Sequence, residues 1–174
     1  MPFWTIRRGT QPSRMQGSTA LDLAPHLEPI HLFTTMGRMD GWIVAVEERM
    51  TDLLNQRDAV RICTDPATDS WSSIDRDDLL LVAPPPMTGS SGRAIHRSKR
   101  RVLARVGRYS VEGIVHMPPG MPLDPYLLRT RQHFMPMTRA VVSSSDESES
   151  GDLYQVVLAN VFNLAELRTL VTLA

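Results

Sequence analysis

The chain has 174 residues and a single cysteine, Cys63, so it cannot form an internal disulfide or a CxxC site. Aromatic residues make up only 6% of the sequence, which leaves few side chains for the stacking platform that single-stranded RNA recognition needs. Lysine and arginine together number 19, as do aspartate and glutamate, and this zero balance argues against a dedicated nucleic-acid-binding protein. No apolar run approaches the length of a membrane-spanning helix.

Signatures of enzymatic chemistry are missing as well. The five histidines show none of the spacings typical of metal sites, and no Gly-x-Ser-x-Gly elbow or glycine-rich phosphate loop occurs. Cys63 follows Ile62 in an apolar strand pattern, which favours a buried structural thiol over a nucleophile. We therefore expect no catalytic residues, no metal site and no cofactor, and we interpret the chain as a non-enzyme.

Short alternating segments dominate what is present, and they predict a mainly β protein. In the first part of the chain we expect a turn at 37–41, a short helix at 50–55, a polar loop before residue 79, and strands at 31–36, 42–46, 59–64 and 79–82. In the second part we expect a turn at 118–120, a short helix at 124–128, and strands at 101–106, 111–117, 133–142 and 153–158.

The two parts look like copies of one unit. Gly37-Arg38 is matched by Gly107-Arg108, and at a constant offset of 74 residues Leu53-Leu54 is matched by Leu127-Leu128 and Asp78-Leu79 by Asp152-Leu153. An internal duplication explains these matches, and coincidence between two β-rich stretches is the alternative. Four or five short strands per copy make a sheet whose edges need closure, which a small antiparallel barrel provides.

The remaining segments frame these two copies. We expect an extended N-terminal arm at 1–30, a first small β-barrel at 31–83, a Pro/Gly/Ser-rich and then basic linker at 84–100, a second small β-barrel at 101–160 and a C-terminal helix at 161–174. The helix is predicted because Asn163 suits an N-cap and the following apolar residues recur at helical spacing: Leu164, Leu167, Leu170 and Val171. Its apolar face either packs on the chain's own barrel or docks a partner.

Two basic segments are the candidate contact regions. The arm combines aromatic and cationic residues, and residues 93–108 contain no acid among seven basic side chains. The basic run is either a solvated segment, a partner of the chain's own acidic loop around Asp146 and Glu147, or a contact for anionic lipid headgroups or an acidic protein face. The predicted partner-binding residues are Phe3, Trp4, Arg7, Arg8, Arg97, Arg100, Arg101 and Arg105.

Two tandem units of this size, each with a Gly-Arg turn and a Leu-Leu helical turn, resemble Sm-like or SH3-like barrels over residues 31–160. The arginine-rich chain also resembles the membrane-extrinsic accessory subunit of Gemmatimonas-type photosynthetic reaction-centre–light-harvesting complexes. That resemblance implies a non-catalytic clamp that binds no pigment and ties the reaction centre to its antenna.

The leading hypothesis is a structural accessory subunit on the cytoplasmic face of a multi-subunit membrane complex. The expected partners are its protein subunits, reaction-centre and antenna polypeptides among them, together with anionic lipid headgroups; nucleic acid is not expected. Residues 1–8 lack the apolar stretch of a secretory signal peptide, so we expect a cytoplasmic protein peripheral to the inner membrane. The alternative is a soluble RNA-binding or signalling adaptor built from the same barrels.

Overall fold

The computed structural model describes residues 26–44, 49–85, 97–129, 132–145 and 151–170. These residues form one antiparallel sheet of ten strands with two short helices, so the mainly β class is confirmed. The first half of the chain contains β1 (Leu27–Thr34), β2 (Gly37–Val44), α1 (Met50–Gln56), β3 (Ala59–Asp65), β4 (Ser70–Asp75), the 3₁₀ turn η1 (Arg76–Asp78) and β5 (Leu79–Ala83). The second half contains β6 (Ser98–Val106), β7 (Tyr109–Met117), α2 (Leu123–Arg129), β8 (Phe134–Ser144), β9 (Asp152–Asn160), η2 (Val161–Asn163) and β10 (Leu164–Thr169). Within the described residues, no helix has the length and apolar character needed to cross a bilayer.

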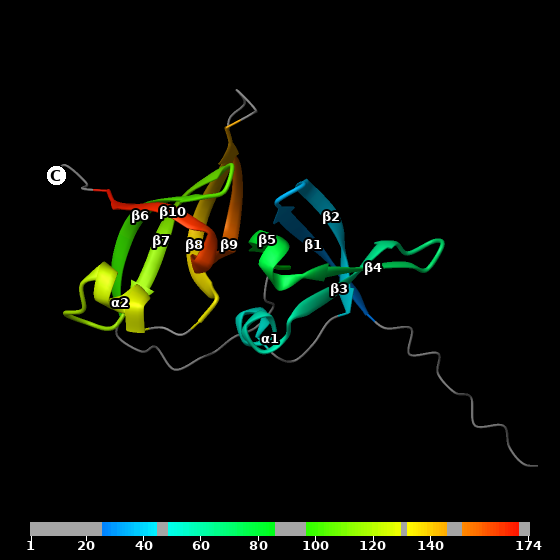
Figure 1. The fold of residues 1–174 in the computed structure, drawn as a ribbon, viewed down its shortest axis with the longest axis horizontal. Helices are drawn as coiled ribbons and strands as arrows, with labels where there is room; N and C mark the ends of the chain where they lie inside the picture. Colours follow the sequence, from blue (N-terminus) through cyan, green and yellow to red (C-terminus); the bar gives the residue numbers. More distant parts are fainter. Residues whose placement is uncertain (1–25, 45–48, 86–96, 130–131, 146–150, 171–174) are drawn as a thin grey trace, which may run out of the picture.

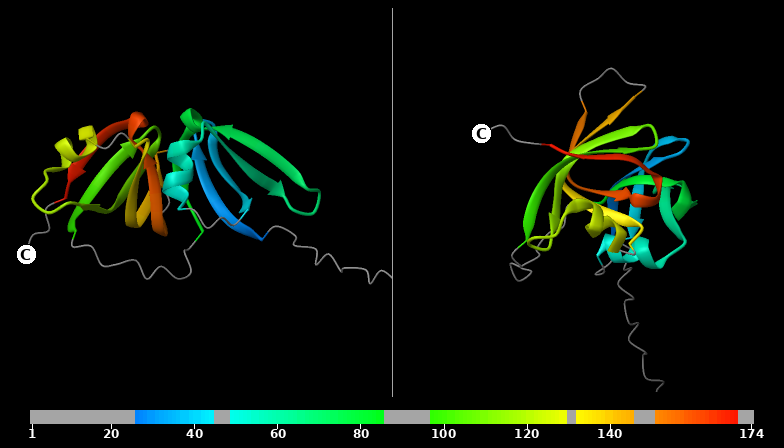
Figure 2. Two further views of the ribbon diagram at one scale, coloured as in Figure 1. Left: turned by 90° about the horizontal axis from the view of Figure 1, so that it is seen from below. Right: turned by 60° about the vertical axis from the view of Figure 1, so that its left-hand side comes forward.

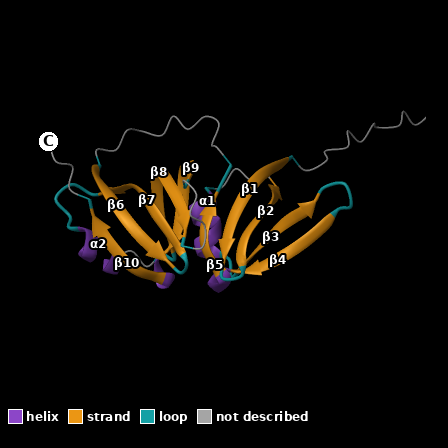
Figure 3. Cartoon of the chain, turned by 90° about the horizontal axis from the view of Figure 1, so that it is seen from above, coloured by secondary structure: helices purple, strands orange, loops and turns teal. Residues whose placement is uncertain are grey.

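The two halves repeat the same order of elements and the same order of strands. Each runs strand, strand, helix, strand, strand, 3₁₀ turn, strand, and the strands are arranged β5-β1-β2-β3-β4 and β10-β6-β7-β8-β9. Figures 1 and 2 show them as two curved sections side by side. Pairing of β5 with β9 joins them into one continuous sheet, drawn by secondary structure in Figure 3. The closure of each half into a separate barrel is therefore not confirmed, although their common topology is clear.

The constant 74-residue offset does not describe the equivalence of the halves. The first hairpin turns at Thr35-Met36 and the second at Gly107-Arg108. Gly37-Arg38 therefore lies two residues beyond the first turn, at the start of β2. The expected turn at 37–41 is therefore wrong. Asp152-Leu153 begins β9, whereas Asp78-Leu79 leads into β5. The residue offset between equivalent positions increases along the chain because β8 and β9 are longer than their counterparts β3 and β4.

The expected polar loop before residue 79 contains strand β4. This strand lies at an edge of the sheet and pairs with β3 alone among the described strands. Ile74 is its single buried side chain, so its sequence lacks the apolar alternation that marks a half-buried strand. Backbone hydrogen bonds to β3, which the sequence pattern does not display, therefore decide its conformation.

The expected C-terminal helix is also wrong. Residues 161–163 form the turn η2 and residues 164–169 form β10, which pairs with β6; residues 171–174 lie outside the described part. A β-bulge between Leu164 and Glu166 adds one residue, so Leu164 and Leu167 both pack on the core despite their helical spacing. The capping residue is Asn160, whose side chain accepts from the Phe162 backbone amide, and not Asn163.

Two hydrophobic cores lie on opposite faces of the central strand β5. All five residues of β5 are buried; Leu81 and Ala83 belong to the core of the second half, and Leu79 and Val82 to that of the first. Each half also contributes a phenylalanine side chain to the core of the other half. Phe33 of β1 packs in the second-half core, and Phe134 of β8 packs in the first-half core. The two halves consequently share their cores and fold against each other.

Polar contacts and a close turn reinforce this junction. The Asn55 side-chain oxygen of α1 accepts from the backbone amides of His133 and Phe134 at 2.6 and 3.2 Å. The turn at Gly107 has a positive φ of 58°, and a Cβ atom there would lie 2.6 Å from Leu80 Cδ1. Glycine at this position lets the β6–β7 turn approach β5 closely.

Candidate interaction surface

The solvent-facing side of the second half carries the side chains that alternate with its core residues. Val102, Ala104 and Val106 of β6 are buried in the core, so the intervening residues of β6 point away from it. We call this side the outer face. Cross-strand register places the following described residues on it: Lys99, Arg101, Leu103 and Arg105 of β6, Glu112, Ile114 and His116 of β7, Val141 of β8, Leu153 of β9, and Glu166 and Arg168 of β10.

A row containing three apolar side chains crosses the outer face. Leu103 pairs with Glu112, Glu112 with Val141, and Val141 with Leu153, so four neighbouring strands contribute to one line. Val141 is 38% exposed and Leu153 is 74% exposed. Large apolar residues gathered on one face, beside charged side chains, are typical of an interaction site.

Positive charge surrounds this row. Four of the outer-face residues named above are cations, Lys99, Arg101, Arg105 and Arg168, and two are carboxylates, Glu112 and Glu166, so this set has a surplus of two positive charges. Arg101 donates from Nε to Glu112 Oε1 at 2.6 Å, and the second carboxylate, Glu166, pairs with both Arg105 and Arg168. Lys99 forms no ion pair with any described residue. These contacts are exposed, so they leave the arginines accessible to another anionic group.

The predicted contact residues divide into three groups. Arg101 and Arg105 lie on the outer face, and Arg97 immediately precedes β6 and lines the pocket described below. Arg100 is exposed but points to the opposite side, because it lies between Lys99 and Arg101 in an extended strand. Phe3, Trp4, Arg7 and Arg8 lie outside the described residues, as do Asp146 and Glu147 of the acidic loop.

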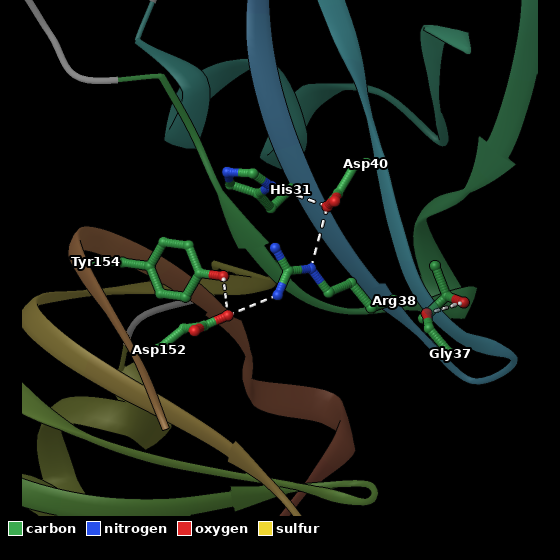
Figure 4. Close-up of polar contacts among 7 residues, drawn as sticks. His31, Gly37, Arg38, Asp40, Asp152 and Tyr154 are labelled. Atoms are coloured by element: carbon green, nitrogen blue, oxygen red, sulfur yellow. Dashed lines mark hydrogen bonds and ion pairs between the residues drawn. The ribbon is translucent and has the colours of Figure 1, made fainter. Parts of the chain in front are cut away.

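Sequence reasoning missed a polar network that joins the halves, centred on Arg38 (Figure 4). Arg38 donates from Nη1 to Asp152 Oδ2 at 2.6 Å and from Nε to Asp40 Oδ1 at 3.1 Å. His31 Nδ1 lies 2.8 Å from the same Asp40 oxygen, and the Tyr154 hydroxyl donates to Asp152 at 3.3 Å. Residues 114 positions apart meet here, so nothing in their local sequence reveals the contact.

The network shifts the titration of its members. Burial acts to raise the pKa of Asp40, but hydrogen bonds from His31 and Arg38 outweigh it and lower the pKa overall. Burial raises the pKa of Tyr154 to about 12, with Arg38 opposing and Asp152 adding to the rise. Arg38 and Asp152 are largely exposed, and such ion pairs contribute up to about 1 kcal/mol each. The network therefore links the two halves through exposed polar contacts.

The described residues hold no grouping of three or more histidine, cysteine, aspartate or glutamate side chains placed to bind a metal ion. Cys63 is 1% exposed, as expected for a structural thiol. Comparison with protein-family models, with curated proteins and with solved structures finds no match for the chain. The interpretation of the outer face therefore depends on its own chemistry.

Proposed function

We propose that the protein is a non-catalytic structural subunit that docks through its outer face on an anionic surface of a membrane-associated protein complex. The observation that supports this proposal is the combination of exposed Leu153 and Val141 with a surplus of positive charge on the same face. A face that is both apolar and cationic suits a membrane-proximal partner, since such surfaces combine anionic headgroups or acidic side chains with apolar contact area.

The two kinds of side chain supply different parts of the binding free energy. A basic residue close to an anionic membrane surface contributes about 1 kcal/mol, and full burial of an exposed leucine adds about 2 kcal/mol. The cations also accelerate encounter and make binding sensitive to salt. Several such contacts, together with Leu153, are sufficient for a stable but salt-dependent attachment.

Two finer proposals complete this function. The repeated strand order β5-β1-β2-β3-β4 supports an origin of both halves in one duplicated small-barrel unit of the SH3-like or Sm-like kind. The complex on which the protein docks is proposed to be photosynthetic, with the protein clamping a reaction centre to its antenna from the cytoplasmic side; this part depends on the resemblance described above. A co-purification experiment from the source cells tests it, because reaction-centre and antenna polypeptides are the expected companions in native mass spectrometry.

Charge reversal on adjacent residues separates docking from general electrostatics. Lys99 and Arg100 are neighbours, both are exposed, and neither side chain forms a hydrogen bond or ion pair with a described residue, but only Lys99 lies on the outer face. In cells expressing the full chain, Lys99→Glu is expected to reduce the membrane-bound fraction, whereas Arg100→Glu leaves it near the wild-type value. Charge reversal removes one attraction and adds one repulsion of about 1 kcal/mol each. The binding free energy should therefore weaken by about 2 kcal/mol, which corresponds to an affinity about thirty-fold lower.

The same assay discriminates the remaining outcomes. Attachment that weakens progressively with added salt and resists nuclease treatment supports docking on a protein or lipid surface. Release by nuclease would favour the RNA-binding adaptor. Equal losses from Lys99→Glu and Arg100→Glu would contradict the assignment of the outer face.

A further inference from the structure

An open pocket of about 400 Å³ is lined by residues from both halves. It includes residues of α1 and α2, which lie at the same end of the sheet in Figure 1. The first half contributes Arg49 and Asp52 to its wall, and the second half contributes Arg97 and His116. The two halves that contribute these residues also share their cores. The volume of the pocket is within the range of about 300–1,000 Å³ typical of small-molecule sites.

The wall of the pocket is cationic. Arg49 and Arg97 bring two guanidinium groups to it, while Asp52 is the carboxylate that lines it. Neither the Arg49 nor the Arg97 side chain forms a hydrogen bond or an ion pair with another residue in the part of the chain that the structure describes. Two guanidinium groups without carboxylate partners, facing one hollow, are suited to an anion with several oxygen atoms.

The pKa of the His116 side chain depends on the charges that line this pocket. Its Nε2 lies 2.8 Å from Thr138 Oγ1, and burial, followed by the charges of Lys99 and Arg97, lowers its pKa. The groups around the imidazole are therefore Lys99 of β6, Arg97 just before that strand, Thr138 of β8, and the pocket-lining residues Arg49 and Asp52. An anion bound among these cations would offset their effect and raise the pKa of His116.

Proline and aromatic side chains form another part of the wall. They are Pro118, Pro119 and Pro136, together with Tyr126 from α2. The pocket is more than ten times the volume of about 30 Å³ that a water molecule occupies in the liquid, so it has room for an organic group besides an anion.

We propose that this pocket binds a small organic phosphate, with its phosphate group between Arg49 and Arg97 and its organic part against the prolines and Tyr126. Planar guanidinium groups bind phosphate oxygens in pairs, and proline rings offer a preformed apolar contact. The phosphate belongs either to the headgroup of an anionic phospholipid or to a soluble phosphate ester. Both sources present the same chemistry to the two arginines.

The test measures the His116 imidazole pKa in the full chain by NMR, with His116→Gln identifying the signal. Glycerol 3-phosphate is expected to raise this pKa by about one unit, since an opposite charge nearby favours the protonated imidazole. Sodium chloride at matched ionic strength is the reference. In the Arg49→Gln/Arg97→Gln variant the ligand-induced shift should disappear, and in the control Arg100→Gln, which removes an exposed arginine outside the pocket wall, it should remain.

The shift on ligand addition is the relevant quantity, because Arg97→Gln alone changes the starting pKa of His116. Equal shifts with glycerol 3-phosphate and with sodium chloride would overturn the proposal, as would a shift that survives in the double variant. Neither result affects docking through Lys99, which the membrane-attachment assay measures separately.

Vesicles of phosphatidylcholine with phosphatidylglycerol distinguish the two sources of phosphate. If the ligand is a headgroup, glycerol 3-phosphate competes with vesicle binding, and the Arg49→Gln/Arg97→Gln variant binds vesicles more weakly. If the ligand is a soluble ester, glycerol 3-phosphate shifts the His116 signal while vesicle binding is the same in wild type and variant. Both patterns require the same two arginines, so both support a phosphate site.

Discussion

Replacing Phe33 with alanine is expected to destabilise the whole protein, although Phe33 belongs to the first half and is buried in the core of the second. Phe33 is 3% exposed and makes edge-on ring contacts with Tyr109 and Tyr154, at centroid distances of 5.1 and 5.9 Å. Truncation of a buried phenylalanine costs about 3–5 kcal/mol, and lost aromatic pairs contribute to this cost. We expect a loss of about 4 kcal/mol, or about 10 °C in Tm for a chain of this size.

Two probes during urea unfolding measure this effect in different parts of the molecule. Two of the three tryptophans, Trp42 and Trp71, lie in β2 and β4, and Trp4 lies outside the described residues. The fluorescence of Trp42 and Trp71 follows the first half, whereas far-UV circular dichroism follows the entire sheet. Both signals should change in one coincident transition, displaced equally in Phe33→Ala. Phe162→Ala is the control: Phe162 is 70% exposed, and its loss should cost less than about 1 kcal/mol. Separate transitions for the two probes, or a similar cost for both substitutions, would refute the shared-core interpretation.

Two further predictions follow from the backbone and the junction. Gly107→Ala should lower the free energy of unfolding by about 1–3 kcal/mol, because its positive φ strains an L-residue and the new Cβ would meet Leu80; Gly120→Ala, with a similar φ and open space, should cost less in the same denaturation assay. Burial acts to raise the pKa of Asp40, but the hydrogen bonds that it accepts lower the pKa overall. The ionised Asp40 carboxylate therefore stabilises the folded protein above pH 3.8, and this stabilisation is lost as the pH falls through the lower pKa of the folded state. Asp40→Asn should therefore flatten the decline of stability in acid, and an unchanged pH profile of Tm would show that the carboxylate does not contribute.

Most strands are predictable because their apolar side chains either alternate with polar ones, as in β3, or form a short continuous run, as in β5. The expected strand at 59–64 is β3, and that at 79–82 is β5, both with buried apolar residues. The expected helices at 50–55 and 124–128 correspond closely to α1 and α2. In these segments local pattern and tertiary structure agree, so the sequence alone suffices.

The errors occurred where pairing with another strand overrides local preference. β10 has the leucine spacing of a helix, but the free edge of β6 and a bulge make it a strand. β4 has one buried residue and therefore no apolar alternation. Both are edge strands of the sheet, where half of the backbone pairing and most side-chain burial are absent.

The candidate surface was predictable in part. The lack of acidic residues in 93–108 predicts contact residues that include Arg97, Arg101 and Arg105. The structure places these three arginines on or beside the outer face. The orientation of Arg100 could not be assigned without the strand's start at Ser98. The sequence places Leu153 in a strand but does not predict which side of the sheet it faces. The pairing of β8 with β9 shows that Leu153 lies beside Val141, and both side chains are exposed.

Site-specific photo-crosslinking tests the docking function most directly. A photoreactive phenylalanine analogue replaces Leu153 on the outer face in one version of the full chain, and exposed Ser73 of the distant edge strand β4 in another. Irradiation of membranes from the source cells should join the Leu153 version to an integral membrane polypeptide and leave the Ser73 version unlinked. Crosslinks from Ser73 alone, or none from either position in membranes that retain the protein, would contradict docking through the outer face.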